Sequence, residues 1–192
     1  MVSIIISGMP ASGKSTVAQI ISKKLHIRYL IGGDILKSMA KDLGFNPEKD
    51  NWWDTEEGRR FLELRMKDPS FDKKVDGILI DAINKEDCVV TSWSIPWLIG
   101  SGHVKVWLKA SSEIRARRLA NRDGLSLTDA RRIIMERDEQ NIKHYQKLYG
   151  YVLGKDLDVF NLIIDVDNVN ADTVAEMLIL YYNDFKSHAE NH

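Results

Sequence analysis

The sequence predicts a single α/β domain in which helices cover both faces of a doubly wound, parallel, five-stranded sheet. Short apolar runs alternate along the chain with longer segments of helical periodicity, which is the pattern of a parallel sheet with helical crossovers. A glycine-rich turn separates the first such run from the first helical segment. The length of 192 residues fits one domain with one sizeable core, and no internal repeat or low-complexity linker divides it.

Five short apolar runs predict the strands, at residues 2–7, 28–31, 88–90, 103–108 and 162–164. Helical periodicity and end signals predict helices over about 15–27, 34–44, 113–122 and 127–149, and after Asn170. Ser111 or Ser112 is a candidate N-cap, Ser126 with Asp129 is another, and residues 47–85 are polar and predominantly helical.

The bulk composition is that of an ordinary soluble globular protein. Hydrophobic residues make up 44%, charged residues 29%, and the net charge is −1, so nothing pulls the chain toward a nucleic acid or a membrane. The single cysteine, Cys88, excludes an intrachain disulfide and fits a reducing compartment. No apolar run reaches about 18 residues, and Met1 leads directly into a strand, so we expect a cytoplasmic protein. Nothing in the sequence indicates an oligomeric state.

Residues 8–15, "GMPASGKS", match the phosphate-binding pattern G-x-x-x-x-G-K-[ST], with a strand before the turn and a helix after it. Glycines at both ends allow backbone N–H groups to approach phosphate oxygens, and the following helix adds its positive end. We therefore expect a nucleoside triphosphate to bind here, with Lys14 on the β- and γ-phosphates and the Ser15 hydroxyl on Mg²⁺. The predicted nucleotide-binding residues are Gly8, Pro10, Ala11, Ser12, Gly13, Lys14, Ser15 and Thr16.

Asn84 to Asp87, "NKED", resembles the guanine-binding element of GTPases, but it precedes a strand here instead of following one. A D-x-x-G switch element is also missing, so we interpret this segment as an ordinary helix-to-strand loop.

A kinase explains the basic segment of the chain better than a GTPase does. Between Lys109 and Lys147 there are ten Lys or Arg against six Asp or Glu, which suggests a small anionic ligand. Helical spacing aligns two sets of side chains, Arg115 with Arg118 and Arg122, and Arg137 with Asn141 and His144. Guanidinium groups stabilise a transferring phosphoryl group, although a solvated face with pairs such as Glu139–Lys143 is the alternative.

Asp34 follows the second predicted strand and should lie beside the phosphate loop. Such a carboxylate can hold a Mg²⁺-bound water or accept the proton of an attacking hydroxyl, and it can also cap the helix that follows. The predicted catalytic residues are therefore Lys14, Asp34, Arg118, Arg122 and Arg137.

Five segments, taken in order, resemble the P-loop nucleoside monophosphate kinases, most closely those of the archaeal cytidylate kinase type: "IIISGMPASGKSTVA", "GGDILKSMAKDLG", "VKVWLKASSEIRARRLANRDGLS", "MERDEQNIKHYQKLYG" and "DLDVFNLIID". The resemblance implies a single kinase domain that uses ATP and Mg²⁺. It also implies a helical acceptor-binding insertion at about 34–85 and a short arginine-bearing lid at about 111–149.

The departures from the family pattern gather on the acceptor side. Lys37 stands where the family has an arginine for the acceptor phosphate. Gly77 and Ile78, which follow "FDKKVD", stand where the family has further arginines. At the end of the third strand, Thr91, Ser92 and Trp93 replace an acid, a glycine and an arginine. The stretch "NWWDTEEGRRFLELRMK" is also unlike the family.

These departures predict that the acceptor is a small phosphorylated molecule other than a nucleotide. The favoured acceptor is mevalonate 3-phosphate, phosphorylated on its 5-hydroxyl in an archaeal mevalonate pathway of isoprenoid biosynthesis, as by a kinase in the same broad family. CMP is the alternative acceptor, and a nucleotide-gated regulatory module with little turnover is a minor one. The predicted acceptor-binding residues are Lys37, Thr91, Ser92, Trp93, Trp97 and His144, and Trp97 is as well explained by the core.

Overall fold

A computed structural model describes residues 1–49 and 51–189. Its centre is a sheet of five strands in the order β2-β3-β1-β4-β5, in which every pair is parallel. The strands are β1 (Ile4–Ser7), β2 (Arg28–Ile31), β3 (Cys88–Thr91), β4 (Val104–Lys109) and β5 (Leu162–Asp165). The predicted fold class and all five predicted strands are confirmed.

Burial explains why these short runs form the sheet. β1 lies in the middle, where Ile4 pairs with Val89 on one side and with Val104 on the other, and all four of its residues are buried. A strand covered by helices on both faces must be apolar along its whole length, and "IIIS" meets that condition.

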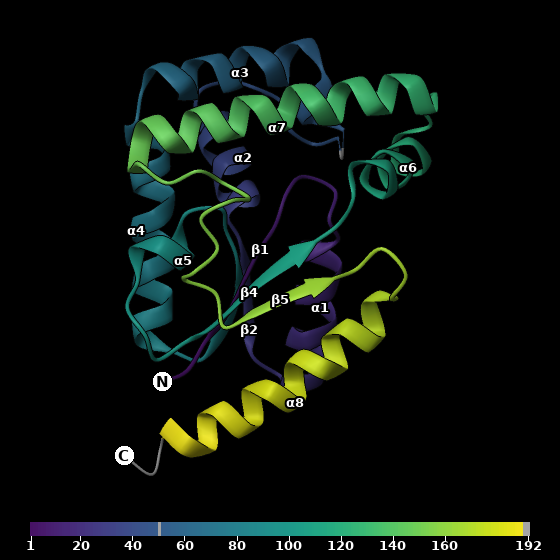
Figure 1. The fold of residues 1–192 in the computed structure, drawn as a ribbon. Helices are drawn as coiled ribbons and strands as arrows, with labels where there is room; N and C mark the ends of the chain where they lie inside the picture. Colours follow the sequence, from purple (N-terminus) through teal and green to yellow (C-terminus); the bar gives the residue numbers. More distant parts are fainter. Residues whose placement is uncertain (50, 190–192) are drawn as a thin grey trace.

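Helices cover both faces of the sheet (Figure 1). They are α1 (Lys14–Leu25), α2 (Gly32–Asp42), the 3₁₀ turn η1 (Trp52–Asp54), α3 (Glu56–Lys67), α4 (Ser70–Lys85), α5 (Ile95–Leu98), α6 (Ser112–Asp123), α7 (Leu127–Tyr149) and α8 (Ala171–Ala189). One core packs α1 and α8 against the sheet through residues such as Ile21 and Leu178. A second core packs α2, α3 and α4 against the opposite face through Leu36, Phe61 and Leu79.

The helix boundaries follow the sequence signals closely. Ser111 and Ser126 are the N-caps of α6 and α7, and each accepts a hydrogen bond from a backbone N–H of the first turn. The Asn170 side chain likewise accepts from the Thr173 N–H, at 2.8 Å. One boundary differs from the prediction: α2 begins at Gly32 instead of residue 34, because β2 passes into the helix without an intervening loop.

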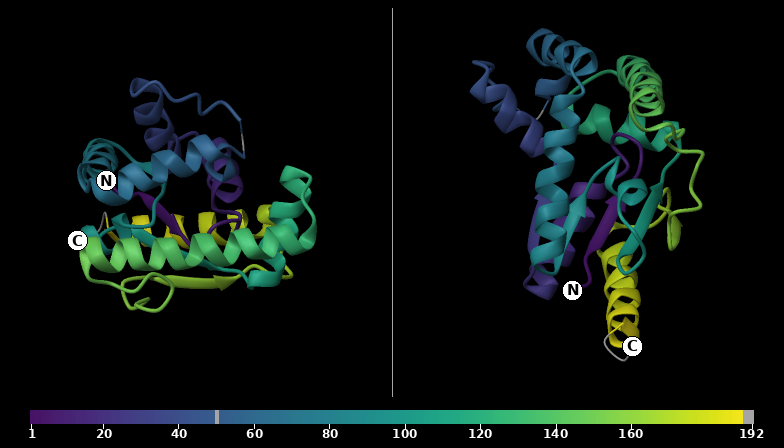
Figure 2. Two further views of the ribbon diagram at one scale, coloured as in Figure 1. Left: turned by 90° about the horizontal axis from the view of Figure 1, so that it is seen from above. Right: turned by 90° about the vertical axis from the view of Figure 1, so that its left-hand side faces the viewer.

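Two helices cross the open end of the sheet and shape the site. α3 and α7 lie side by side above the end to which the strands point (Figures 1 and 2), and Arg65 of α3 donates a hydrogen bond to the Tyr145 hydroxyl of α7. The connections from β1 and β3 leave the sheet toward this end, which is where parallel α/β sheets hold their ligands. Within residues 1–49 and 51–189, no helix has both the length and the apolar character needed to span a membrane.

Candidate active site

The turn between β1 and α1 has the backbone of a phosphate-binding loop. Gly8 and Gly13 have φ angles of 152° and 96°, and even Ala11 is held at 60°. A Cβ atom on Gly8 would lie 2.6 Å from the Leu108 carbonyl oxygen, so only glycine fits there. The loop ends at the N-terminus of α1, whose backbone N–H groups have no partner within the helix and attract anions.

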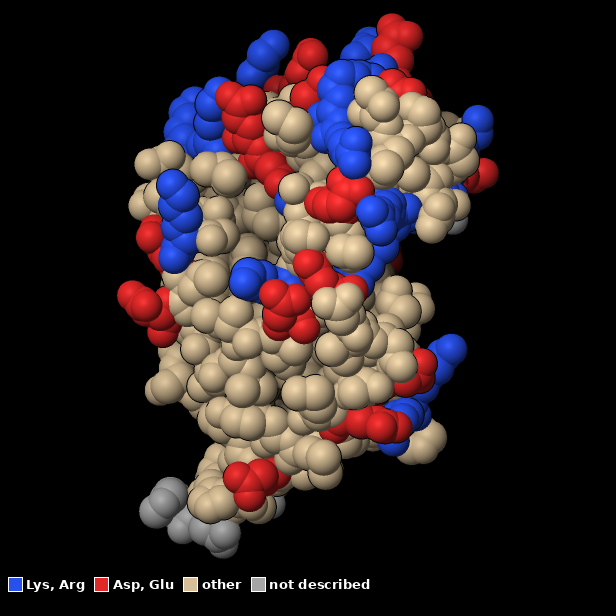
Figure 3. Space-filling model, turned by 45° about the vertical axis from the view of Figure 1, so that its right-hand side comes forward, with Lys and Arg blue, Asp and Glu red and all other residues tan. Residues whose placement is uncertain are grey.

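Two cavities flank this loop. The first, of about 490 Å³, opens toward the ends of β2 and β3, α2 and α7, and the second, of about 540 Å³, opens toward α6 and the start of α8. Most predicted site residues line the first: Pro10, Ala11, Lys14, Ser15, Asp34, Lys37, Thr91, Ser92, Trp93, Arg122, Arg137 and His144. Ala11, Ser12, Gly13, Lys14, Ser15, Thr16, Arg118 and Arg122 line the second. Figure 3 shows a hollow on one margin of the molecule with basic side chains at its border.

Lys14 lies under the loop with its ammonium group on the loop's own carbonyls. Its Nζ donates to the Gly8 oxygen at 2.8 Å and to the Met9 oxygen at 2.9 Å. Burial, together with the positive charges of Arg137 and Arg115, lowers the pKa of Lys14 to about 7. Phosphate oxygens beside this group would raise its pKa and favour its charged form.

Arg137 and Arg122 reach the first cavity from α7 and α6, and both approach one carboxylate. Asp54 of η1 places its Oδ2 atom 3.5 Å from Arg137 and 3.9 Å from Arg122. Arg122 also pairs with Asp123 at 2.6 Å. Burial lowers the pKa of Arg137, and the negative charge of Asp54 opposes that effect. The Asp54 carboxylate thus lies as an anion between the two arginines. The sequence around Asp54 gave no sign of this role.

Two other arginines of α6 turn to the backbone instead of the first cavity. Arg118 donates to the Ser12 oxygen at 3.0 Å and to the Val166 oxygen at 2.7 Å, beside the second cavity. Arg115 is buried and pairs with Asp138 at 2.5 Å while donating to the Pro10 oxygen. The three arginines predicted to share one helix face therefore separate: Arg122 reaches both cavities, Arg118 the second, and Arg115 supports the loop from below.

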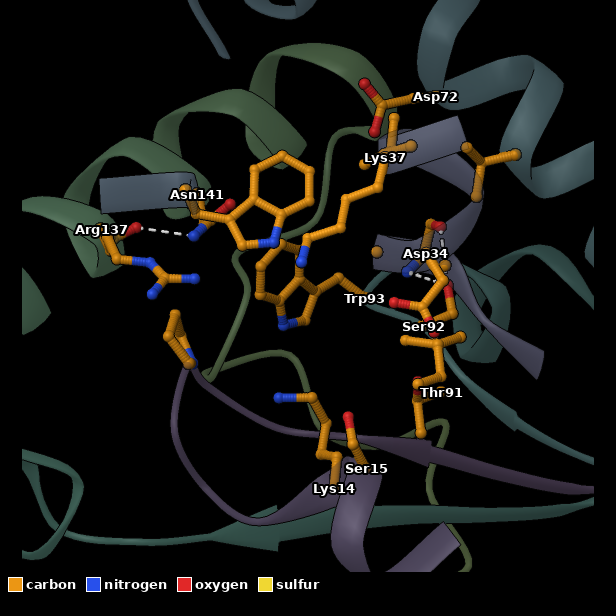
Figure 4. Close-up of a pocket in the computed structure, with 18 of the residues that line it drawn as sticks. Lys14, Ser15, Asp34, Lys37, Asp72, Thr91, Ser92, Trp93, Arg137 and Asn141 are labelled. Carbon is orange, nitrogen blue, oxygen red and sulfur yellow. Dashed lines mark hydrogen bonds between the residues drawn. The ribbon is translucent and has the colours of Figure 1, made fainter. Parts of the chain in front are cut away.

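Asp34 and Lys37 enter the first cavity from the first two turns of α2, opposite Arg137 (Figure 4). Burial raises the pKa of the Asp34 carboxyl, and the charge of Lys37 partly offsets that effect. The Lys37 Nζ donates to the Lys49 carbonyl oxygen at 3.2 Å. A carboxylate with a raised pKa, aimed at the space above Ser15, is suited to take a proton from an incoming hydroxyl.

A buried polar cluster closes the far end of the first cavity, and sequence reasoning found only one of its members. Arg65 holds Asp72 through both Nε and Nη2, the His144 Nε2 atom lies 2.8 Å from Asp72, and Tyr145 hydrogen-bonds both Arg65 and Asp72. Burial raises the pKa of Asp72, but the His144 hydrogen bond and the Arg65 charge outweigh it and lower the pKa to about 2. Beside it, Asp76 accepts hydrogen bonds from Ser94 and Tyr149, and burial raises its pKa. The available signal was the spacing of Asp72 and Asp76, one helical turn apart.

The side chains of the two tryptophans after β3 lie in different surroundings. The Trp93 ring faces the first cavity, as Figure 4 shows, and its Nε1 donates to the Gly8 oxygen at 2.8 Å. The Trp97 ring instead stacks on Tyr151, with centroids 3.9 Å apart, and its Nε1 donates to the Asp156 oxygen. Trp97 lies outside the residues that line either cavity.

The oxygen atoms needed for Mg²⁺ are available but few. Ser15, Asp34 and Thr91 all line the first cavity near the phosphate loop, and each carries the hard oxygen ligand that Mg²⁺ prefers. Within the part of the chain that the structure describes, no group of three His, Cys, Asp or Glu side chains could hold a metal by itself. This donor set fits an ion that keeps several waters and is shared with a phosphorylated ligand.

The segment Asn84 to Asp87 has a structural role. Asp87 accepts a hydrogen bond from the Val2 N–H at 2.8 Å and pairs with Lys186 of α8, at the end of the sheet opposite the phosphate loop. Asn84 and Lys85 are the last residues of α4, so only Glu86 and Asp87 form the predicted helix-to-strand connection.

A phosphate loop between two cavities, with a lysine beneath it and arginines opposite, defines a P-loop phosphotransferase. Residues 3–168 match the model of the cytidylate kinase-like family. The chain is 37% identical over 185 residues to the cytidylate kinase of Sulfurisphaera tokodaii, covering 94% of each chain. It is 34% identical over 182 residues to that of Pyrobaculum aerophilum, covering 94% of this chain and 92% of the relative. The chain belongs to the cytidylate kinase-like family.

The fold is also similar to that of the shikimate kinase from Bacteroides thetaiotaomicron, with a TM-score of 0.58 and 14% identity over 94% of this chain and 97% of that one. This likeness concerns the fold alone. Together, the family and the site establish a kinase, and the predicted resemblance is confirmed.

Proposed function

We propose that this chain transfers the γ-phosphoryl group of ATP to a small phosphorylated acceptor bound in the first cavity. The observation that carries this proposal is the convergence of Lys14, Arg137, Lys37 and Asp34 on one space beside the phosphate loop. Three cationic groups can hold the phosphates of donor and acceptor, and the carboxylate can take a proton.

The residues of the chain fit ATP and Mg²⁺. Backbone N–H groups of the loop and the start of α1 face the phosphates, and Lys14 supplies charge on the β- and γ-oxygens. Mg²⁺, when bound, neutralises charge that develops on the phosphate oxygens. Ser15 and Asp34 would hold it, directly or through water, and Arg122 and Arg137 would exchange Asp54 for the transferring phosphoryl group. We further propose that residues 34–85 form the acceptor-binding insertion and 111–149 the lid.

CMP is the first candidate acceptor, because the relatives with the stated identities are named cytidylate kinases. The cavity offers groups that suit a pyrimidine. Aromatic rings of Trp93 and Tyr145 line it, and Asp76 with Ser94 at its far end presents oxygen atoms to an exocyclic amine.

Mevalonate 3-phosphate is the second candidate, and one observation favours it. The end of β3 presents the hydroxyls of Thr91 and Ser92 and the ring of Trp93 to the cavity, where the family has an acid and an arginine. A branched alcohol needs an apolar wall, a basic anchor and a proton acceptor, and Trp93, Lys37 and Asp34 supply these in one place. In CMP, by contrast, the accepting group is a phosphate, which is already ionised and needs no base.

An acceptor panel tests these proposals. Purified protein with ATP and Mg²⁺ is offered CMP, UMP, AMP, dCMP, mevalonate 3-phosphate and mevalonate, and ADP release is followed. Turnover of CMP at about 1–100 s⁻¹ supports the first candidate and rejects the second, and turnover of mevalonate 3-phosphate alone does the reverse. ADP release that never depends on an added acceptor would contradict phosphoryl transfer and favour the regulatory module.

A further inference from the structure

Trp93 connects the end of β3 directly to the phosphate loop. Its indole N–H donates to the Gly8 oxygen at 2.8 Å, and its ring centroid lies 5.6 Å from the Lys14 Nζ atom. The residue is held from behind, because the Tyr151 hydroxyl donates to the Trp93 backbone oxygen at 2.8 Å and the Tyr145 ring packs edge-on at 6.0 Å. Trp93 therefore has little freedom to move away from Gly8.

The Gly8 carbonyl has two donors in this structure. Lys14 donates to it at 2.8 Å, at the same distance as Trp93, which uses both lone pairs of the oxygen. Gly8 is buried, so water has little access to its carbonyl group. The neighbouring Met9 carbonyl, which Lys14 also contacts, is part of a half-buried residue.

Phosphate binding changes this arrangement. The Lys14 ammonium group has three protons, and in this structure it directs them to the Gly8 and Met9 oxygens and toward the Ser12 hydroxyl at 3.5 Å. To hold β- and γ-phosphate oxygens, the group must turn away from these carbonyls. A buried carbonyl that loses its only donor incurs the full desolvation penalty of an unpaired polar group.

We propose that Trp93 is a positioning residue that keeps the Gly8 carbonyl hydrogen-bonded when Lys14 turns to the phosphates of ATP. The indole N–H lowers the free energy needed to release the lysine, and so strengthens donor binding from the acceptor side of the loop. The proposal rests on the proposed use of ATP but on neither candidate acceptor. It gives Trp93 a function toward the donor, in addition to the wall that its ring forms.

The substitution Trp93→Phe tests this role, because it keeps an aromatic ring and removes the N–H group. ATP binding is measured by calorimetry with Mg²⁺ and without any acceptor. We expect the affinity to fall about 5- to 150-fold, which corresponds to 1–3 kcal/mol for one unpaired buried acceptor at 1.4 kcal/mol per tenfold. Trp97→Phe is the matched control, because it removes an indole N–H that also donates to a backbone carbonyl, that of Asp156 outside the phosphate loop. Its ATP affinity should equal that of the unmodified protein.

A second comparison separates this role from simple support of the loop. In a Lys14→Met background the Gly8 oxygen has only Trp93 as a donor, both with and without ATP. Trp93→Phe should therefore cause no further loss of ATP affinity there, within about twofold. An equal loss in both backgrounds would overturn the proposal, since it would show that Trp93 only shapes the loop.

The remaining outcomes are also decisive. Unchanged ATP affinity in Trp93→Phe overturns this inference and leaves the proposed function standing, whereas an unmodified protein that binds no ATP overturns both. Thermal unfolding without ATP checks the fold. If Trp93→Phe unfolds early, benzothienylalanine at position 93 keeps the bicyclic shape with sulfur in place of N–H, and the same loss of affinity is expected.

Discussion

The buried Asp72 carboxylate should make the stability of this protein depend on pH in the acid range. Arg65, His144 and Tyr145 hold it in place, and its side chain is only 5% exposed. Its pKa of about 2 lies below the ordinary value of 3.8, and this difference corresponds to about 2 kcal/mol of stability. Because the folded-state pKa is the lower one, this stabilisation is present above pH 3.8 and is lost as the pH falls toward 2.

Asp72→Asn removes the charge and keeps the shape. At pH 7 we expect the variant to lose about 3–5 kcal/mol of unfolding free energy, because Arg65 stays buried without its counter-ion. Urea unfolding followed by circular dichroism at several pH values from 7 to 2 measures the effect. Between pH 5 and pH 2 the unmodified protein should lose about 2 kcal/mol more than the variant, because only the unmodified protein has the Asp72 carboxylate that takes up a proton there.

The exposed Asp158 provides a matched control, and Asp158→Asn should follow the unmodified protein throughout. If Asp72→Asn and the unmodified protein gave parallel curves of stability against pH, the cluster would not hold an ionised carboxylate. A loss below about 1 kcal/mol at pH 7 would likewise show that Asp72 and Arg65 are not a dry ion pair.

Three further predictions concern the phosphate site. Lys14→Met should lower turnover with any acceptor at least about 100-fold, as expected for one transition-state cation, with ADP release as the measurement and correct folding as the condition. Because burial lowers the pKa of Lys14 to about 7, ATP affinity should weaken as the pH rises from 6 to 8, and calorimetry on Lys14→Met should show a flatter profile. Asp34→Asn should lower turnover about 10²- to 10⁴-fold if the acceptor group is a hydroxyl that needs a base. A much smaller loss with CMP would agree with an acceptor phosphate that is already ionised, and an equal loss with both would contradict a base role.

Much of the fold was predictable because its signals are local. Each strand is a short apolar run, and Ser111 and Ser126 cap the starts of α6 and α7, as their positions in the sequence indicate. The phosphate loop was predictable for the same reason, since Gly8 to Ser15 form a continuous segment whose backbone geometry depends on glycines at set positions.

The acceptor side was only partly predictable, because its contacts join residues far apart in the chain. Arg65 meets Tyr145 across 80 positions, and Asp72 meets His144 across 72. The sequence placed Arg65 in an unusual segment and His144 on a basic helix, but it did not show that Asp72 lies between them. Charge patterning also grouped Arg115 with Arg118 and Arg122, whereas packing of α6 against the loop directs Arg115 and Arg118 to backbone carbonyls.

The local sequence was thus sufficient to predict the loop where we propose that the phosphoryl donor binds. The turn with glycines at both ends, followed by a lysine and a serine, leads from a strand into a helix, and its backbone N–H groups suit phosphate oxygens. The first cavity, where we propose that the acceptor binds, required the packing of α3 and α7 across the sheet, which brings Arg65, Asp72 and His144 together. Trp93 and Trp97, four positions apart, illustrate the difference: the chain turns between them, so one indole holds Gly8 and the other packs on Tyr151.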